Sequence, residues 1–203
     1  FKICPFWYVD TTTSTNAFLW RISLVVHCCT CLINCSLDLC QQRITPEKIK
    51  SMIAYLSGGM EHALNEGEGW RNDMTGWLQK NLGHSVIDPV KSSRQIVDET
   101  NSHDYKSWKK SNPKKYKEFV RKLIQQDLDG VIHKANYVIC LWDKGVVKGG
   151  GTHGEVTIAY HYNIPVYLVN TLPFDELSGW IFSCSTEMYT QFSQLRKRLS
   201  ELY

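Results

Sequence analysis

The chain has 203 residues, of which 43% are hydrophobic, so it can bury the core of one domain and carry an appendage besides. Its formal net charge of +3 gives no overall signal for binding a polyanion. Six of the eight cysteines lie in the first 40 residues. A secreted disulfide framework would spread its cysteines over the whole fold, so we expect the remainder to occupy a reducing, cytoplasmic compartment.

The first 51 residues differ in character from the rest. Their semi-apolar stretch at 17–39 is long enough for a membrane span, but four polar residues interrupt it: Arg21, His27, Asn34 and Asp38. Such interruptions are costly at the centre of a bilayer, so a membrane span or signal anchor is the less favoured interpretation.

A zinc site formed by the clustered cysteines is a second alternative for this segment. The cluster lacks the paired C-x2-C spacing of zinc knuckles, and it contains two adjacent cysteines: Cys28, Cys29, Cys31 and Cys35. We therefore predict that residues 1–51 are a poorly ordered, non-catalytic extension and that 52–203 form the domain. Met52 stands at the beginning of the first predicted strand, which suggests it as a natural start.

From residue 52 onward, short apolar runs alternate with stretches of helical periodicity. We predict strands at these runs: 52–57, 86–87, 136–142, 165–169 and 181–184. We predict helices at 70–82, from Pro113 to about 124, at 156–162 and at 191–202. The polar stretch before Asn112 carries too much charge for a core. This alternation of helices with continuously apolar strands predicts a flavodoxin-like, doubly wound α/β domain with a parallel sheet of about five strands.

The ligand site of such a sheet is expected outside the carboxyl ends of its strands. Three features fall near that edge: the Gly58-Gly59 pair, Asp127, and the loop from Gly149 to Glu155. Glycines let a loop backbone approach a ligand closely, and the amides at the start of the following helix suit a phosphate or a hydroxyl.

Three blocks of sequence resemble the nucleoside 2-deoxyribosyltransferase-like superfamily of deoxyribosyltransferases and nucleotide N-glycoside hydrolases. In order, they are YLSGGMEHA with the following GWR, then QQDLDGVIHKANYVICLW, then GGGTHGEVTIAYHYNIPVYLV. The resemblance spans about 52–202. It implies an enzyme without a cofactor that cleaves or exchanges the N-glycosidic bond of a nucleoside or nucleoside 5′-monophosphate. It also implies a homodimer or a larger homo-oligomer.

The resemblance implies that Glu155 is the nucleophile, because the family's catalytic glutamate stands in a glycine-rich loop at the head of a helix. Cleavage builds positive charge on the sugar C1′, which a carboxylate stabilises or traps as an ester. The local alternative is a capping box, in which Thr152 caps the helix and Glu155 bonds the Thr152 amide. A cap needs no run of three glycines, so the catalytic role is favoured.

The same resemblance assigns the other site residues. Asp127, in its D-L context, matches the aspartate that handles the base, and Tyr55, Gly58, Gly59, Arg71, Gly151 and Thr152 are implied to bind substrate. Structural alternatives remain: the pattern does not separate Asp127 from Asp129, Tyr55 could belong to the core, and Arg71 could form a surface ion pair. Gly149 stands where deoxyribosyltransferases carry an aspartate, which favours a hydrolase over a transferase.

Other partners are not expected. The eight lysines and arginines between 106 and 122 are typical of a solvated helix face, so no specific nucleic-acid partner is predicted. His62 and His153 lack a second ligand at useful spacing, so no metal is predicted. The rival interpretation is a non-catalytic nucleotide-binding or sensor domain with the same fold.

Overall fold

A computed structural model describes residues 51–203, and the predictions for residues 1–50 lie outside this part. The described part contains a sheet of five parallel strands in the order β2-β1-β3-β4-β5. Its strands are β1 Ile53–Gly58, β2 Ser85–Ile87, β3 Tyr137–Trp142, β4 Val166–Asn170 and β5 Glu187–Tyr189. The predicted flavodoxin-like α/β fold is thereby confirmed.

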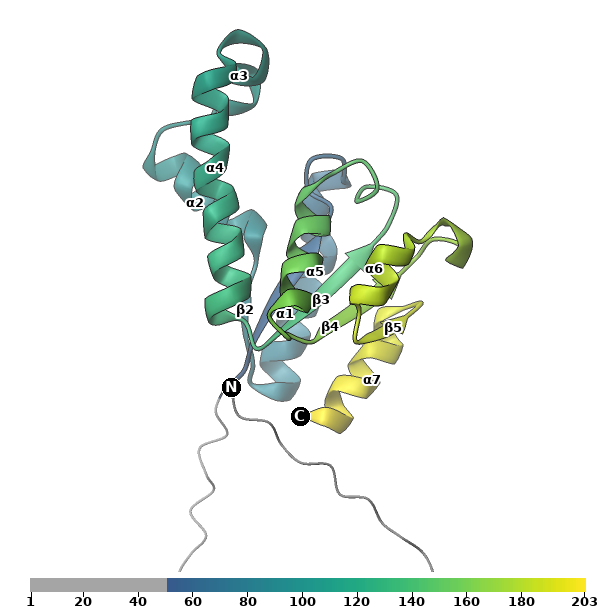
Figure 1. The fold of residues 1–203 in the computed structure, drawn as a ribbon. Helices are drawn as coiled ribbons and strands as arrows, with labels where there is room; N and C mark the ends of the chain where they lie inside the picture. The colour runs from purple at the N-terminus through teal and green to yellow at the C-terminus, as the bar shows by residue number, and fades with distance from the viewer. Residues whose placement is uncertain (1–50) are drawn as a thin grey trace, which may run out of the picture. The chain divides into compact units, whose positions relative to one another are not determined.

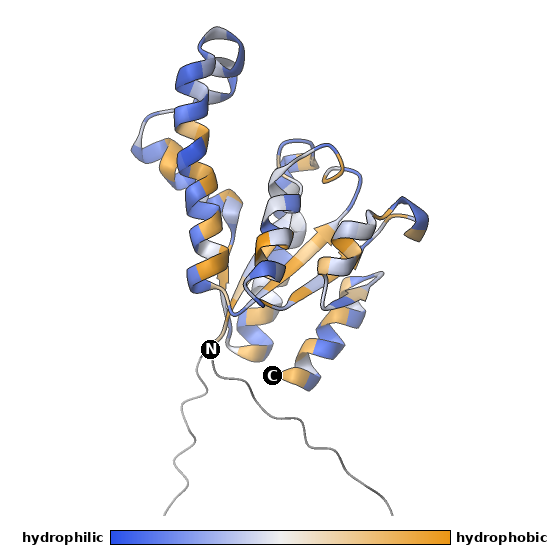
Figure 2. Ribbon diagram, viewed as in Figure 1, coloured by the Kyte–Doolittle hydropathy of each residue, from blue (hydrophilic) through white to orange (hydrophobic). Residues whose placement is uncertain are grey.

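Helices cover both faces of the sheet (Figure 1). They are α1 Glu68–Leu82, α2 Pro89–Glu99, α3 Tyr105–Ser111, α4 Pro113–Asp129, α5 Gly151–His161, α6 Gly179–Cys184 and α7 Phe192–Leu202, with short helical turns at Leu64–Gly67, Gly130–Lys134 and Phe174–Glu176. Apolar side chains of α1 and α7 pack on one face, and those of α5, α6 and the Gly130–Lys134 turn pack on the other. Figure 2 shows the hydrophobic strands between these helices. Within residues 51–203, no helix combines the length and the apolar character needed to cross a bilayer.

The interior strand β1 sends alternate side chains to opposite faces of the sheet, as any strand does. Ala54 and Leu56 join the core under α1 and α7. Tyr55 joins the opposite core, under α5, and Ser57 contacts α5 from the same side. Residues 54–57 are all completely buried, so β1 places polar atoms of Tyr55 and Ser57 inside the protein, next to α5.

The polar stretch between β2 and α4 forms two helices that were not predicted from the sequence, α2 and α3. Asp88 caps α2 by accepting from the Val90 amide, and Asn112 caps α4 by accepting from the Lys115 amide. A separate apolar cluster joins α2, α3 and α4, with Trp108 only 8% exposed at its centre. The prediction that this stretch is too charged for a core is therefore wrong, because few apolar residues suffice where three helices meet at one cluster.

The strand predicted at 181–184 is also wrong. This run is the short helix α6, and the fifth strand follows it at Glu187–Tyr189. Ile181 and Cys184 are buried while Phe182 between them is exposed, which is the three-residue spacing of one helix face. An apolar run of four residues carries no periodicity that could separate these two structures.

Candidate active site

The Glu155 carboxylate accepts hydrogen bonds from two hydroxyl groups of β1. The Tyr55 hydroxyl donates to Oε1 at 2.8 Å, and the Ser57 hydroxyl donates to Oε2. Glu155 is 6% exposed, while Tyr55 and Ser57 are completely buried. The alternation of β1 brings both hydroxyls to the α5 face, so each carboxylate oxygen has its own donor.

The start of α5 excludes the capping-box alternative. The helix begins at Gly151 with Gly150 as its N-cap, and no side chain caps it. Glu155 is therefore the fifth residue of the helix rather than the third after a Thr152 cap. Its carboxylate turns across to β1 instead of back to the Thr152 amide. Thr152 lies buried in the first turn of this helix.

Burial raises the pKa of Glu155, and the hydrogen bonds from Ser57 and Tyr55 oppose that effect, as does the positive charge of Arg71. A hydrogen bond donated to a carboxylate favours its charged form. The geometry therefore holds a buried carboxylate whose negative charge is stabilised by hydroxyl donors and by one cation.

Asp127 lies near the end of α4, close enough to Glu155 for the two carboxyl groups to interact electrostatically. Burial, followed by the negative charge of Glu155, raises the pKa of Asp127 to about 8. Neighbouring carboxyl groups in a poorly solvated site do not both ionise readily. Because both oxygens of Glu155 have hydroxyl donors while Asp127 Oδ1 has none, the hydrogen bonds favour the negative charge on Glu155 over a charge on Asp127.

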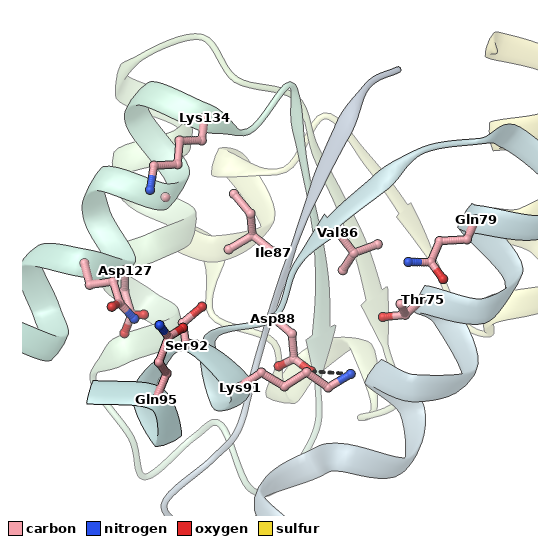
Figure 3. A pocket seen from close by; sticks show the side chains of 12 residues that line it. Thr75, Gln79, Val86, Ile87, Asp88, Lys91, Ser92, Gln95, Asp127 and Lys134 are labelled. Carbon is pink, nitrogen blue, oxygen red and sulfur yellow. Dashed lines mark ion pairs between the residues drawn. The ribbon is translucent and has the colours of Figure 1, made fainter. Parts of the chain in front are cut away.

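Asp127 also lines a groove of about 480 Å³ at the β2 edge of the sheet. Figure 3 shows Thr75 and Gln79 on one side, Asp127 on the other, and Val86 and Ile87 between them. Four buried side-chain atoms in its wall have no hydrogen-bond partner among the described residues: Thr75 Oγ1, Asp88 Oδ2, Gln126 Nε2 and Asp127 Oδ1. Buried polar atoms normally find a partner, so these atoms suit a polar ligand or ordered water.

Arg71 stabilises the loop that follows β1 through hydrogen bonds to backbone carbonyl oxygens. Its guanidinium is completely buried and donates to the carbonyl oxygens of Leu56 at 3.2 Å, Gly58 at 2.8 Å and Glu66 at 2.7 Å. Its Nε also lies 3.7 Å from Asp88 Oδ1. The alternative of a surface ion pair is therefore wrong, because α1 turns this side chain inward to satisfy backbone carbonyls. These contacts indicate that Arg71 stabilises the conformation of the loop.

Two of the three predicted glycines, Gly58 and Gly59, lie at close contacts between chain segments. A Cβ on Gly58 would come within 2.9 Å of the Trp70 ring, and a Cβ on Gly59 within 3.2 Å of the Gly145 backbone. Gly151, by contrast, has open space around it at the first position of α5. The glycine pair therefore brings the loops after β1 and β3 together at the carboxyl edge.

A second hollow, of about 550 Å³, opens at this carboxyl edge. The loops after β1, β3 and β4 line it with His62, Lys144 and Thr171, and α1 contributes Trp70. Glu155 is not among the lining residues of either hollow.

Ser57 and Gln126 are two further residues of the site that were not predicted from the sequence. Ser57 stands two positions after Tyr55 on a strand, and this period-two spacing was the signal that both face the same side. Gln126 is the neighbour of Asp127 on α4 and lines the same groove. The local sequence pattern could not predict that Gln126 lines a groove, because this groove forms only where α1, α2 and α4 meet at β2.

Solved structures share this fold. A 2-deoxyribosyltransferase from the psychrotolerant bacterium Bacillus psychrosaccharolyticus matches with a TM-score of 0.51 and 17% identity, over 71% of this chain and 90% of that one. A conserved protein from Enterococcus faecalis V583 matches with a TM-score of 0.52 and 11% identity, over 75% and 99%. A CMP N-glycosidase from Clostridium botulinum has a TM-score of 0.44 and 16% identity, over 74% and 99%.

No protein-family model matches the chain, and no curated protein matches it. At these identities the structural likeness concerns the fold. These structures confirm the fold that the resemblance of the three sequence blocks implies.

Proposed function

We propose that this protein cleaves or exchanges the N-glycosidic bond of a nucleoside or nucleoside 5′-monophosphate, with Glu155 as the nucleophile. One arrangement carries the proposal: a buried carboxylate near the carboxyl edge of the sheet is held by two hydroxyls, beside a second carboxyl, Asp127, whose pKa is raised to about 8 by burial and by the charge of Glu155. An ionised carboxylate next to a protonated one is the acid–base pairing that glycosidic cleavage uses.

In the first step, one oxygen of Glu155 forms a bond to the sugar C1′ as the bond from C1′ to the base nitrogen breaks. The electron pair of the broken bond leaves with the base. Asp127 donates its proton to the base, so that the base departs neutral. The products of this step are a glycosyl ester of Glu155 and an ionised Asp127.

In the second step, water or an acceptor base attacks C1′ and releases Glu155 as a carboxylate. Asp127 accepts the proton that the attacking group loses, which restores the starting state. Water gives hydrolysis and an acceptor base gives exchange. Because Gly149 replaces the aspartate expected of a transferase, we favour hydrolysis.

The groove beside Asp127 is the proposed place for the leaving base. A purine or pyrimidine ring presents donors and acceptors around its edge, and the groove offers unpartnered atoms of both kinds, from Gln126 and Thr75. The volume of about 480 Å³ is in the range of small-molecule sites. We therefore expect Gln126→Ala to change the preference among bases more than it changes the rate with the best one.

The proposed assembly is a homodimer or a larger homo-oligomer whose subunits complete each other's sites, and its support is the sequence resemblance. Light scattering of the purified full chain tests it. A mass of two or more chains agrees with the proposal, and a monomer that retains full activity contradicts it.

The rival function is a sensor that binds a nucleotide without cleaving it. The observation that favours it is the burial of Glu155, whose two oxygens already have partners. A structural carboxylate would be held in the same way. The two functions differ in turnover, which an assay measures directly.

The test incubates the full chain with the common ribo- and 2′-deoxyribonucleosides and their 5′-monophosphates, with and without a free acceptor base. Free base released without an acceptor identifies a hydrolase, and a new nucleoside formed with an acceptor identifies a transferase. Binding with neither product identifies a sensor. Glu155→Gln is the matched control, because it keeps the size of the side chain and removes its charge.

A further inference from the structure

We propose that Ser57 is a positioning residue that sets the orientation and the charge state of the Glu155 carboxylate. The inference rests on the proposed function for its effect on turnover, but its geometry stands independently. The Ser57 hydroxyl contacts Oε2 while the Tyr55 hydroxyl contacts Oε1, so rotation of the carboxylate would break both hydrogen bonds.

The backbone around Ser57 is fixed from both sides. The Arg71 guanidinium donates to the carbonyl oxygen of Leu56, before Ser57, and to that of Gly58, after it. On the adjacent strand, Cys140 is the partner of Ser57 in the parallel register. Arg71 therefore fixes the place of Ser57, and Ser57 in turn fixes Glu155.

The hydrogen bond of the Ser57 hydroxyl differs from most side-chain hydrogen bonds in its partner. Most side-chain hydrogen bonds in proteins go to backbone or water, whereas this hydroxyl donates to a carboxylate 98 positions away in the chain. The strand itself is already held by its pairing with β2 and β3. Replacing Ser57 with alanine should therefore remove a constraint on Glu155 without removing one on the sheet.

The hydroxyl also favours the charged form of Glu155. Its hydrogen bond lowers the pKa of Glu155 against the effect of burial. Burial raises the pKa of the neighbouring Cys140 thiol, so this thiol stays neutral and adds no competing negative charge. Loss of the hydroxyl should raise the pKa of Glu155, so that a larger fraction of the enzyme is protonated and inactive at mildly acidic pH.

The experiment compares the wild-type full chain with Ser57→Ala and Ser57→Thr, and with Ser93→Ala as the control for loss of a buried hydroxyl elsewhere. We expect Ser57→Ala to lower kcat about 10- to 100-fold, as the loss of a hydrogen bond to a charged group predicts. KM should change little, and the acid limb of the kcat profile should move to higher pH. Ser57→Thr should recover part of the rate, and Ser93→Ala should match the wild type.

A wild-type rate and an unmoved acid limb in Ser57→Ala would overturn the inference, as would a folded Ser57→Thr no faster than Ser57→Ala. If the wild type turns over no nucleoside, the proposed function fails, and a second measurement still tests Ser57. This measurement is the titration of Glu155 by carbon NMR of the labelled carboxyl. A higher pKa in Ser57→Ala supports the positioning role, and an unchanged pKa overturns it.

Discussion

The Tyr55 hydroxyl donates a 2.8 Å hydrogen bond to Oε1 of Glu155, which lies one hundred positions later in the chain. The parallel sheet makes this contact possible, because β1 and β3 are neighbours and α5 begins after β3. Tyr55, on an interior strand of the sheet, thus reaches Glu155 near the start of α5. Because its carboxylate is bound to Tyr55, Glu155 does not act as a cap of α5.

Replacing Tyr55 with phenylalanine should lower kcat about 10- to 100-fold, because a hydrogen bond to a charged carboxylate contributes roughly 1.5–3 kcal/mol. The ring stays in the core, so the urea midpoint should fall only slightly. Steady-state kinetics of the full chain check the rate. Tyr137→Phe is a suitable control, since Tyr137 is equally buried and its hydroxyl pairs with His84, away from Glu155.

The activity should decline as the pH rises through about 8, because Asp127 then loses the proton that, in the proposed mechanism, it donates to the leaving base. Asp127→Asn should lower kcat by about 100-fold or more and should abolish this basic limb. The control is Asp129→Asn, two positions further on, where the carboxylate accepts from Gln125 instead. Equal losses of kcat in Asp127→Asn and Asp129→Asn would contradict the proposed role of Asp127 as the proton donor.

Asp127 should also make the stability depend on pH. Its folded-state pKa of about 8 lies above the ordinary value of 3.8, so the folded protein holds this proton more tightly than the unfolded chain does. The resulting stabilisation is complete below about pH 4 and is lost as the pH rises through about 8. Asp127→Asn should remove this loss, so the variant should gain roughly 1–3 kcal/mol on the wild type between pH 5 and 9. Urea unfolding at several pH values measures the difference, and parallel curves would be evidence against the raised pKa.

Replacing Arg71 with methionine should destabilise the protein by about 3–5 kcal/mol, because Asp88 and several backbone carbonyls would lose a buried partner. Arg94→Met is the matched control, since Arg94 makes ion pairs at the surface with Glu66 and Glu68. Such surface pairs contribute about 1 kcal/mol or less. Similar midpoints of unfolding in the two variants would argue against a structural role for Arg71.

Much of the fold was predictable because the core strands are continuously apolar. The segments that became β1, β3 and β4 have this character, and Pro113 marked the start of α4. The helices α2 and α3 were not predictable, since their apolar residues are few and acquire a core only against α4. The run at 181–184 was too short for periodicity to distinguish a helix from a strand.

The candidate site was only partly predictable from sequence. Glu155 and Asp127 stood in recognisable contexts, but the sequence could not say which way the Glu155 carboxylate turns. That direction depends on where α5 begins and on the hydroxyls of β1, which are distant in sequence. The inward direction of the Arg71 side chain was not predictable either. Its partners are backbone carbonyls, which every sequence has and which therefore leave no pattern in the sequence.

The most direct test of the central claim is peptide mass spectrometry of the full chain, quenched with acid during turnover of its best substrate. We predict that the peptide containing Glu155 carries the mass of one glycosyl residue. Glu155→Gln should carry no such adduct and should have no measurable turnover. A sugar adduct on another residue, or a Glu155→Gln variant that releases base at the wild-type rate, would contradict the account.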